Sequence, residues 1–392
     1  MISITDKKRC VGCGSCISAC RKKAICFIED EQGFVYPIVN TSLCVECGMC
    51  ESVCPIEYTR TQNDFHEKPL CYAAWNINND ERKSSSSGGV FTLLAKDFLD
   101  ENGMVCGATW SNDLRVQHKL VSTIGQLSGM RKAKYIQSDT SGVFERIKQQ
   151  LDSGKNILFS GTPCQVAGLK SFLKQDYDNL LTVEVICHGV VSQKVFSRYI
   201  ESLENHLESK VMCFDFRDKT NGWMNYNVLA DLMNHKSYIK SHNKDEYMLG
   251  YLWYNLFFRP ACTNCKFKVF PRRADITLGD YWGADEKLFG RENCDKGISV
   301  VLLNSSKGHR MFDSISKNIV KKEIDLDKVI SGNPSLVKSS NVGKYSSYFF
   351  KHYTEKDFID LIHKIEHKSL WDRKDLTLKD RAFLLKSRLK GR

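Results

Sequence analysis

Two runs of four cysteines in the first sixty residues constrain this chain more than any other feature of its sequence. The first run has the spacing Cys-x2-Cys-x2-Cys-x3-Cys, and the second repeats it and is followed by Pro55. Three thiols at two-residue gaps can face one side of a tight turn, and the fourth closes the cage from farther away. The runs comprise Cys10, Cys13, Cys16 and Cys20, then Cys44, Cys47, Cys50 and Cys54. They predict two linked four-thiolate cages.

This spacing resembles that of bacterial two-cluster ferredoxins, in which the fourth cysteine of each run ligates the other cluster. The resemblance implies two 4Fe–4S clusters, one held by Cys10, Cys13, Cys16 and Cys54 and the other by Cys44, Cys47, Cys50 and Cys20. The first run departs from the pattern at Arg21, which stands where a proline is usual, but no ligand is lost. Cys-x2-Cys pairs also bind zinc, and the repeated four-cysteine spacing favours iron–sulfur clusters over zinc.

The composition indicates the redox environment of these thiols. The chain has 17 cysteines, no run of 18 apolar residues and no apolar signal-peptide segment within residues 1–20. We therefore expect a cytoplasmic protein with reduced thiols, in which many cysteines indicate metal binding rather than disulfides.

The remaining sequence alternates short apolar strands with amphipathic helices. Strands are expected at 71–76, 104–110, 116–122, 156–160, 180–187, 211–216, 226–232, 275–278 and 298–303. Helices are expected at 90–101, 141–151 (capped by Ser141), 165–173 and 193–207, and 247–258 is expected as a buried helix. This alternation predicts an α/β or α+β fold with a mixed sheet and helices on both faces. No G-x-G-x-x-G follows a strand, so a Rossmann dinucleotide site is not supported.

Two loops carry candidate ligand-binding groups. Ser84–Gly89 leads into the helix expected from Val90, where glycines and free N–H groups favour an anion such as phosphate. A flexible serine linker or a simple helix cap explains the same composition equally well. The second loop, Ser160–Cys164, lies at a strand end, where α/β sheets place ligands.

Four further cysteines lie at expected turns. Cys164 ends the second loop, Cys187 precedes His188 at the end of a strand, and Cys262 and Cys265 form a Cys-x2-Cys pair. Spacing alone does not show whether these thiols meet, so a third metal site stays open at this point.

Taken together, several segments in order resemble the coenzyme F-420 hydrogenase/dehydrogenase beta-subunit family, which are iron–sulfur flavoproteins. With the ferredoxin-like runs, the resemblance covers most of the chain. The segments are 85–96 (SSSGGVFTLLAK), 134–139 (KYIQSD), 158–169 (LFSGTPCQVAGL), 186–190 (ICHGV), 259–267 (RPACTNCKF) and 275–283 (DITLGDYWG).

The resemblance implies a third 4Fe–4S cluster with FAD beside it. The cluster ligands would be Cys164, Cys187, Cys262 and Cys265. The flavin diphosphate would lie on Ser86, Ser87, Gly88 and Gly89, with further flavin contacts from Lys134, Gln137, Ser138, Ser160, Gly161 and Thr162. Asp280 would support the cluster loop or the flavin pocket, or act as a cap.

The expected function is an iron–sulfur flavoprotein oxidoreductase that passes electrons from the ferredoxin-type clusters through the third cluster and FAD to a substrate. The substrate, a small or lipid-linked molecule, is not identified by any motif, and use of the deazaflavin coenzyme and the direction of electron flow stay open. His188 is a candidate proton donor or hydrogen-bond partner, with a structural role as the alternative.

The competing hypothesis is an electron-transfer subunit that relays electrons to a partner enzyme. A substrate-sized cavity at the flavin would favour the oxidoreductase, and an exposed docking surface would favour the relay. Either function requires a redox partner, such as a ferredoxin or another electron donor.

The expected domain boundaries are 1–58 for the ferredoxin domain, 59–69 for a linker, 70–345 for the FAD and 4Fe–4S domain and 346–392 for a basic helical tail. Of the net charge of +11, residues 368–392 contribute nine Lys and Arg against three Asp. Leu378, Ala382, Leu385 and Leu389 share a helical stripe there, which predicts a packed terminal helix. Peripheral membrane contact or partner docking are the alternatives, and no nucleic acid is expected.

Twelve cysteines are thus assigned to clusters. Cys26, Cys71, Cys106 and Cys213 lie in or near apolar runs and are expected in the core, whereas Cys294 is expected to be more exposed.

Overall fold

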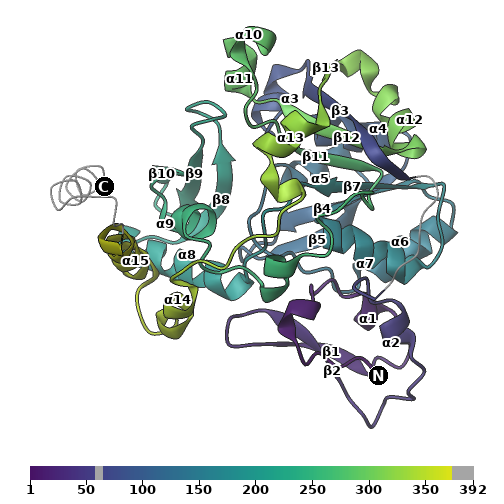
Figure 1. Cartoon of the computed structure of the whole chain (residues 1–392), viewed down its shortest axis with the longest axis horizontal. Coiled ribbons are helices and arrows are strands. Elements are labelled where there is room, and N and C mark those ends of the chain that lie inside the picture. Colours follow the sequence, from purple (N-terminus) through teal and green to yellow (C-terminus); the bar gives the residue numbers. More distant parts are fainter. Residues whose placement is uncertain (58–64, 373–392) are drawn as a thin grey trace.

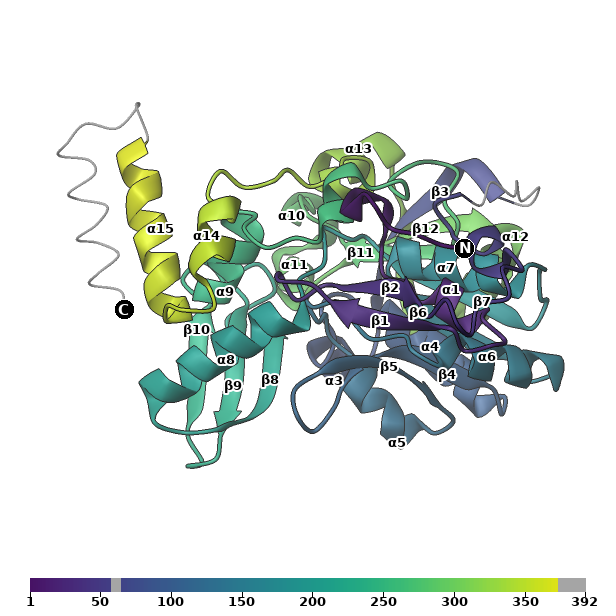
Figure 2. The same cartoon turned by 90° about the horizontal axis from the view of Figure 1, so that it is seen from below.

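A computed structural model of the chain describes residues 1–57 and 65–372, which form three packed parts (Figure 1). An N-terminal module carries the two cysteine runs. A large mixed sheet with helices on both faces forms the body, so the expected mixed α/β class is confirmed. A second, smaller sheet lies beside the body, next to the C-terminal helices (Figure 2).

The N-terminal module repeats one local pattern twice. Helices α1 (Ser15–Ser18) and α2 (Met49–Ser52) each begin directly after a glycine in the left-handed conformation, Gly14 with φ 81° and Gly48 with φ 70°. Each glycine follows the second cysteine of its run, and the turn it permits places the third cysteine in the helix. A short helix η1 (Lys7–Arg9) precedes the first run, and the antiparallel strands β1 (Ile25–Glu29) and β2 (Val35–Val39) connect the halves.

The body is centred on an eight-stranded sheet in the order β13-β3-β12-β11-β7-β6-β4-β5. The inner pairs β11–β7, β7–β6 and β6–β4 are parallel, and antiparallel pairs flank them. The strands are β3 (Phe65–Asn76), β4 (Met104–Trp110), β5 (Val116–Val121), β6 (Ile157–Gly161), β7 (Leu180–Val185), β11 (Ile276–Asp280), β12 (Ser299–Ser305) and β13 (Ile319–Glu323). The carboxyl ends of the parallel strands therefore meet at one edge of the sheet.

Helices cover both faces of this sheet because its central strands are apolar on both sides. On β6, Leu158 packs with α4 (Val90–Asp100) and α12 (Ser306–Ser314). Its neighbours Ile157 and Phe159 point the other way and pack with α6 (Val143–Asp152) and α7 (Pro163–Leu173). Shorter elements complete the body: α3 (Asn79–Lys83), α5 (Ile124–Leu127), η2 (Ser128–Met130), η4 (Pro260–Asn264), α10 (Glu286–Phe289), α11 (Arg291–Lys296), η5 (Ser316–Asn318), α13 (Leu326–Gly332) and η6 (Pro334–Leu336).

The third part has its own aromatic core. Phe196 and Tyr199 of α8 (Gln193–Leu207) pack against Phe214 and Phe216 of β8 (Val211–Asp218), with ring centroids of Phe214 and Phe216 4.8 Å apart. The same core joins β9 (Asn227–Leu232), β10 (Ser237–Ser241), α9 (Glu246–Met248), the π-helix η3 (Leu249–Trp253), α14 (Ser346–His352) and α15 (Phe358–Asp372). The strand order is β10-β9-β8, and all pairs are antiparallel.

The expected strands and helices of the body are present, with ends displaced by a few residues, but two local predictions are wrong. Helix α6 is preceded by Gly142 with φ 67°, so Ser141 is not its cap. The apolar stretch 247–258 is not one helix, because η3 ends at Trp253 and Asn255 turns the chain with φ 49°.

At the expected linker, β3 begins at Phe65, and residues 58–64 lie outside the described chain. The stripe of Leu378, Ala382, Leu385 and Leu389 in the basic tail also lies outside the described residues. None of the helices within 1–57 and 65–372 has the length and apolarity of a membrane span.

Three of the five cysteines outside the cluster assignments are placed differently from the prediction. Cys71 and Cys106 are buried as expected. Cys26 and Cys213 are exposed, because β1 and β8 belong to small sheets that leave one face to solvent. Cys294 is buried instead of exposed, since α11 turns it toward the core that includes Tyr281 and Phe289.

The N-terminal module docks on α7 through a close backbone approach. Ser15 Oγ donates to the carbonyl of Gly168 at 2.8 Å, and a β-carbon at Gly168 would lie 2.8 Å from Cys13 Cβ. Ser171 Oγ, one turn later, donates to the carbonyl of Val53 at 2.7 Å. Glycine at position 168 is therefore what lets the first cysteine run approach the body.

We expect Gly168→Ala to lower stability although alanine is the better helix former. Alanine gains about 1 kcal/mol of helix propensity, but overpacking against Cys13 costs about 1–3 kcal/mol. Anaerobic thermal unfolding of the full chain measures the net effect. Gly125→Ala in α5 is the matched control, because a β-carbon there meets nothing within 4 Å, and it should not destabilise. A variant at position 168 as stable as the control would contradict this account of docking.

Candidate functional site

A cavity of about 760 Å³ opens at the carboxyl ends of the parallel strands. Its wall includes Gly161 from the end of β6, Ile186 and Cys187 after β7, and Gly279 and Asp280 from β11. This edge is where an α/β sheet commonly binds ligands, because the connecting loops diverge there. The second sheet closes the opposite side with Arg217 and Tyr226.

Most of the residues expected at the flavin line this one cavity. They are Ser86, Ser87, Gly89, Lys134, Ser138, Ser160, Gly161 and Thr162, together with His188 and Asp280. Gly88 lies outside the lining and packs so closely that a β-carbon would be 2.3 Å from the carbonyl oxygen of Ala74. Gln137 is also outside it, and its Nε2 donates to the carbonyl of Val11 in the N-terminal module at 3.0 Å. The fold thus brings distant sequence segments to one site, with Gly88 and Gln137 as the two exceptions.

The serine and glycine loop is held in a fixed shape beside the cavity. Ser86 Oγ accepts from the N–H of Ala133 at 2.7 Å, and Ser87 Oγ donates to the carbonyl of Ile298 at 2.8 Å. Gly89 has φ 84° and leads into α4, whose first N–H groups have no partner within the helix. The loop is therefore an ordered helix start rather than a flexible linker.

Two lysines beside this loop, the buried Lys219 and the half-buried Lys134, have no carboxylate partner among the residues that the structure describes. Lys219 donates to the carbonyls of Arg82 and Ser87 at 2.6 and 3.0 Å, and Lys134 donates to those of Arg131 and Lys132 at 2.9 and 3.2 Å. Burial lowers the pKa of both lysines to about 7. A largely desolvated ammonium bonded only to carbonyls favours an anionic ligand nearby, since that ligand would restore its charged form.

Beside the loop, an ion pair and two stacked indoles lie at the cavity, and two of these four residues were not indicated by the sequence. Arg217 donates to both oxygens of Asp280 at 2.8 and 3.1 Å and to the carbonyl of Ser86 at 3.0 Å. Trp223 donates to Asp280 at 2.8 Å and stacks on Trp282, with ring centroids 4.9 Å apart and planes 2° apart. Trp282 in turn lines the cavity and offers a flat apolar surface. Asp280 and Trp282 lie within a recognised motif, whereas Arg217 and Trp223 lie in a stretch without one.

The four other candidate metal ligands also converge. Cys164 lies in the first turn of α7, Cys187 follows β7, and Cys262 and Cys265 lie at η4. All four line a second cavity of about 30 Å³. Burial is the main cause that raises the pKa of Cys187 to about 12 and of Cys262 to about 11, and neighbouring thiols of the set add to it. These thiols therefore need a cation to become ligands.

The spacing of these sulfurs differs from that of a single zinc site. Four thiolates around one zinc ion at about 2.3 Å lie only about 3.8 Å from one another. Among the described residues, no three cysteine sulfurs lie within 4.8 Å of one another. A wider cage such as a 4Fe–4S cluster is compatible with this set, and the same holds for the two N-terminal sets.

Buried positive charge supports an anionic group among these four cysteines. Lys268 is buried and donates to the carbonyls of His188 and Lys338 at 3.2 and 2.9 Å. Its charge and that of Arg272 favour the thiolate form of Cys187 and so act to lower that thiol's pKa. Arg272 has a carboxylate partner in Glu184, whereas Lys268 has none among the residues described.

The first cysteine set crosses between the two runs. Burial raises the pKa of Cys13 to about 11, with Cys10 and Cys54 as charged neighbours, and Cys16 has the same neighbours. Cys54 from the second run thus lies with three cysteines of the first, which is the arrangement that the crossed assignment requires. In the other set, Cys47 is exposed and Cys44 and Cys50 lie near the N-terminal amine.

His188 has both ring nitrogens engaged. Nδ1 lies 3.2 Å from Ser335 Oγ, and Nε2 lies 3.1 Å from Asn255 Oδ1. Burial lowers the pKa of His188, so the neutral ring is favoured, with Nε2–H donating to Asn255. This geometry favours a hydrogen-bonding role over proton donation. The side chain still contributes to the wall that the two cavities share, which comprises Cys187, His188, Gly189, Val190 and Ser335.

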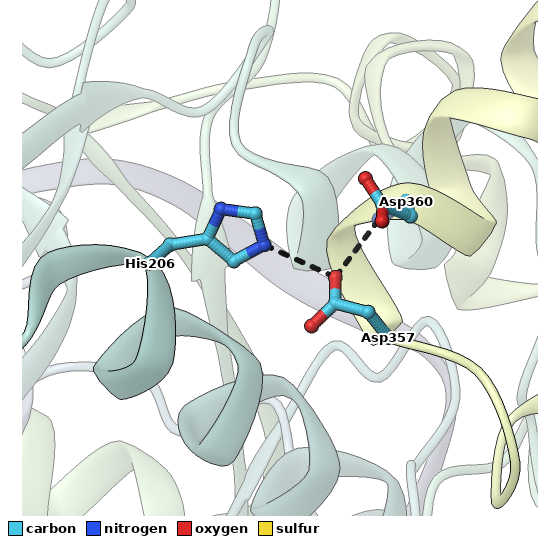
Figure 3. A group of neighbouring side chains, drawn as sticks. All are labelled: His206, Asp357 and Asp360. Carbon is cyan, nitrogen blue, oxygen red and sulfur yellow. Dashed lines mark hydrogen bonds and ion pairs between the residues drawn. The ribbon is translucent and has the colours of Figure 1, made fainter.

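Outside the linings of both cavities, the polar side chains of His206, Asp357 and Asp360 lie together where α8 meets the start of α15 (Figure 3). Asp357 accepts from the N–H of Asp360 at 3.1 Å at the start of α15, and from Ser202 Oγ of α8 at 2.6 Å. His206 Nε2 lies 3.2 Å from the same carboxylate. These contacts explain the group as a helix cap that ties α8 to α15.

Two segments of the chain match models of known protein families. Residues 154–328 match the family model for the C terminus of the coenzyme F420 hydrogenase/dehydrogenase beta subunit, and residues 9–58 match a 4Fe-4S dicluster domain. The matched part of the body is similar to this family, and the N-terminal module is similar to a 4Fe-4S dicluster domain, which supports an iron–sulfur electron-transfer protein. A solved structure, a xenon derivative of the F420-reducing NiFe hydrogenase complex from Methanosarcina barkeri, is 16% identical over 82% of this chain and 98% of that chain, with a TM-score of 0.45. No curated protein matches the chain.

If the four cysteines of the body hold a cluster, we expect Cys262→Ala to lose about four of the iron atoms bound by the anaerobically purified chain, because one of the four ligands would be gone. Iron and acid-labile sulfide analysis measures the loss. Cys294→Ala is the matched control, since Cys294 is a buried cysteine outside all three sets. Equal iron in the two variants would contradict the assignment of Cys262.

Proposed function

We propose that this protein is an iron–sulfur flavoprotein oxidoreductase that carries electrons between a redox partner and a small substrate. The path would include the two clusters of the N-terminal module, a third cluster at Cys164, Cys187, Cys262 and Cys265, and FAD in the large cavity. Bound FAD would supply the exchange between one-electron and two-electron chemistry. The observation that carries the proposal is the wall that the four-cysteine cavity and the large cavity share.

The large cavity fits a flavin nucleotide in size and in the chemistry of its wall. Its volume is within the range of about 300–1,000 Å³ common for cofactor sites. The ordered loop at Ser86, Ser87 and Gly89 and the side chain of Lys134 would hold the diphosphate, and Lys219 would support the loop by donating to the Ser87 carbonyl. The indole of Trp282 offers a stacking surface for a planar ring.

The protein's own residues prepare the site in three ways. Asp280 balances the charge of Arg217, so this arginine orients the loop through the Ser86 carbonyl without adding net charge. Asn255 and Ser335 fix the ring of His188 beside Cys187. Met224 and Trp253 line the cavity with half or more of each side chain exposed, at 52% and 62%, and would meet an entering substrate.

The cavity favours this function over a pure relay to a partner enzyme. A relay needs only an exposed docking surface, whereas the chain has a cavity of about 760 Å³ beside the four cysteines. The electron donor would be a separate redox protein, and the substrate a small or lipid-linked molecule that reaches the cavity.

The proposed diphosphate contact predicts a pH dependence of FAD binding. The pKa of Lys134 is lowered to about 7 by burial, and a bound anion would raise it. Below pH 7 the ammonium is already charged, whereas above pH 7 binding must take up a proton. Affinity should therefore fall as pH rises, by up to about tenfold per pH unit.

Flavin fluorescence titration of the purified full chain at pH 6 and pH 8.5 measures this dependence. Lys134→Met should weaken FAD binding at pH 6 by about tenfold and flatten the dependence. Lys307→Met is the control, because Lys307 also donates to two carbonyls, those of Tyr177 and Leu180, away from the cavity. FAD binding that is independent of both pH and Lys134 would contradict the assignment of this contact.

A further inference from the structure

One arginine of the body is inserted into the N-terminal module. Arg259 is 1% exposed, and its Nε donates to the carbonyl of Cys10 at 2.8 Å while Nη2 donates to that of Val35 at 2.9 Å. The backbone carbonyl of Arg259 accepts a hydrogen bond from the N–H of Cys262, three residues later in the body, at 2.9 Å. One residue is thus bonded to a cysteine of each neighbouring set.

The guanidinium of Arg259 has no carboxylate partner within residues 1–57 and 65–372. Its remaining N–H groups face Gln137 Oε1 at 3.0 Å, and its charge lies over the rings of Tyr36 and Phe34 at 4.5 and 5.5 Å. A buried charge with only neutral partners is strongly unfavourable, so an anion close by is expected.

The two cysteine sets are the anionic groups within reach. Nη2 lies 3.6 Å from Cys10 Sγ, as a donor to that sulfur. Arg259 also lines the small cavity of the body's four cysteines. No other arginine among the described residues lines this cavity and also bonds to a cysteine of the N-terminal module.

The first cysteine run is shaped around this arginine. Gly12 lies between Cys10 and Cys13 with φ 67°, and a β-carbon there would be 2.9 Å from Arg259 Cζ and 2.7 Å from Gln137 Nε2. Only glycine leaves room for the guanidinium at this depth. The close packing thus depends on a glycine of the N-terminal module and on an arginine of the body.

We propose that Arg259 is a positive charge shared by two iron–sulfur clusters, the one ligated through Cys10 and the one ligated through Cys262. This inference rests on the proposed third cluster. A fixed positive charge stabilises the reduced, more negative state of a nearby cluster and so raises its reduction potential. Because a guanidinium stays protonated, the effect needs no proton transfer. Arg259 is thus a positioning residue that would raise the reduction potentials of both clusters together.

The test is an EPR-monitored redox titration of the anaerobically purified full chain. In Arg259→Gln, the potentials of the clusters ligated through Cys10 and Cys262 should both shift to lower values, and that of the cluster ligated through Cys44 should not move. Arg259→Lys keeps the charge and should leave both potentials close to those of the wild-type protein. Lys194→Met is the control, because Lys194 crosses the same interface to Glu29 at 3.4 Å, and it should leave all potentials unchanged.

The outcomes separate this inference from the proposed function. A wild-type chain with about 8 rather than about 12 iron atoms would contradict the third cluster itself. With about 12 iron atoms, unmoved potentials, or a shift of one cluster alone, would overturn the role of Arg259 only. If Arg259→Gln loses iron, Arg259→Lys should retain it, and loss in both variants would show that the shape of the guanidinium rather than its charge is required.

Discussion

The close contact between Cys13 and Gly168 is the constraint on which the rest of the arrangement depends. It seats the first cysteine run on α7, whose first turn carries Cys164 of the body's set. Val11 and Cys13 share one apolar cluster with Cys164 and Cys265. Through this packing, residues more than a hundred positions apart form neighbouring thiol sets, and the second of these sets shares a wall with the large cavity. The docking of the N-terminal module on α7 therefore determines that its first cysteine set, the body's cysteine set and the large cavity follow one another.

The partners of the buried cations point to the same sites independently of the packing. Arg259, Lys268 and Lys219 are buried and donate to neutral acceptors. In contrast, Arg217 and Arg272 are buried with carboxylate partners. Cations of the first kind cluster around the cysteine sets and the Ser84–Gly89 loop, where anionic groups are expected, and those of the second kind hold the framework. Buried charge thus distinguishes the parts that bind from the parts that support.

Much of this organisation could be predicted from the sequence, because it resides in local patterns. Alternating apolar runs located the strands of the body, and cysteine spacing together with the family resemblance located the candidate ligands. What could not be predicted depends on tertiary packing. Arg217 reaches the cavity wall and Trp223 supports that wall only when the second sheet meets the body, and Gln137 faces the N-terminal module because the module docks there. The burial of Cys294 and the exposure of Cys26 depend on which face of a small element is covered.

The central claim is that the N-terminal module and the body place two clusters side by side as one redox unit. EPR spectroscopy of the fully reduced, anaerobically purified chain tests it most directly, because paramagnetic clusters whose ligands are in contact broaden and split each other's signals. We expect the wild-type spectrum to contain an interaction that involves the third cluster and that is lost in Cys262→Ala, which leaves the spectrum of the two module clusters with their own interaction. A wild-type spectrum that is the plain sum of isolated clusters, with no interaction lost in the variant, would contradict the account.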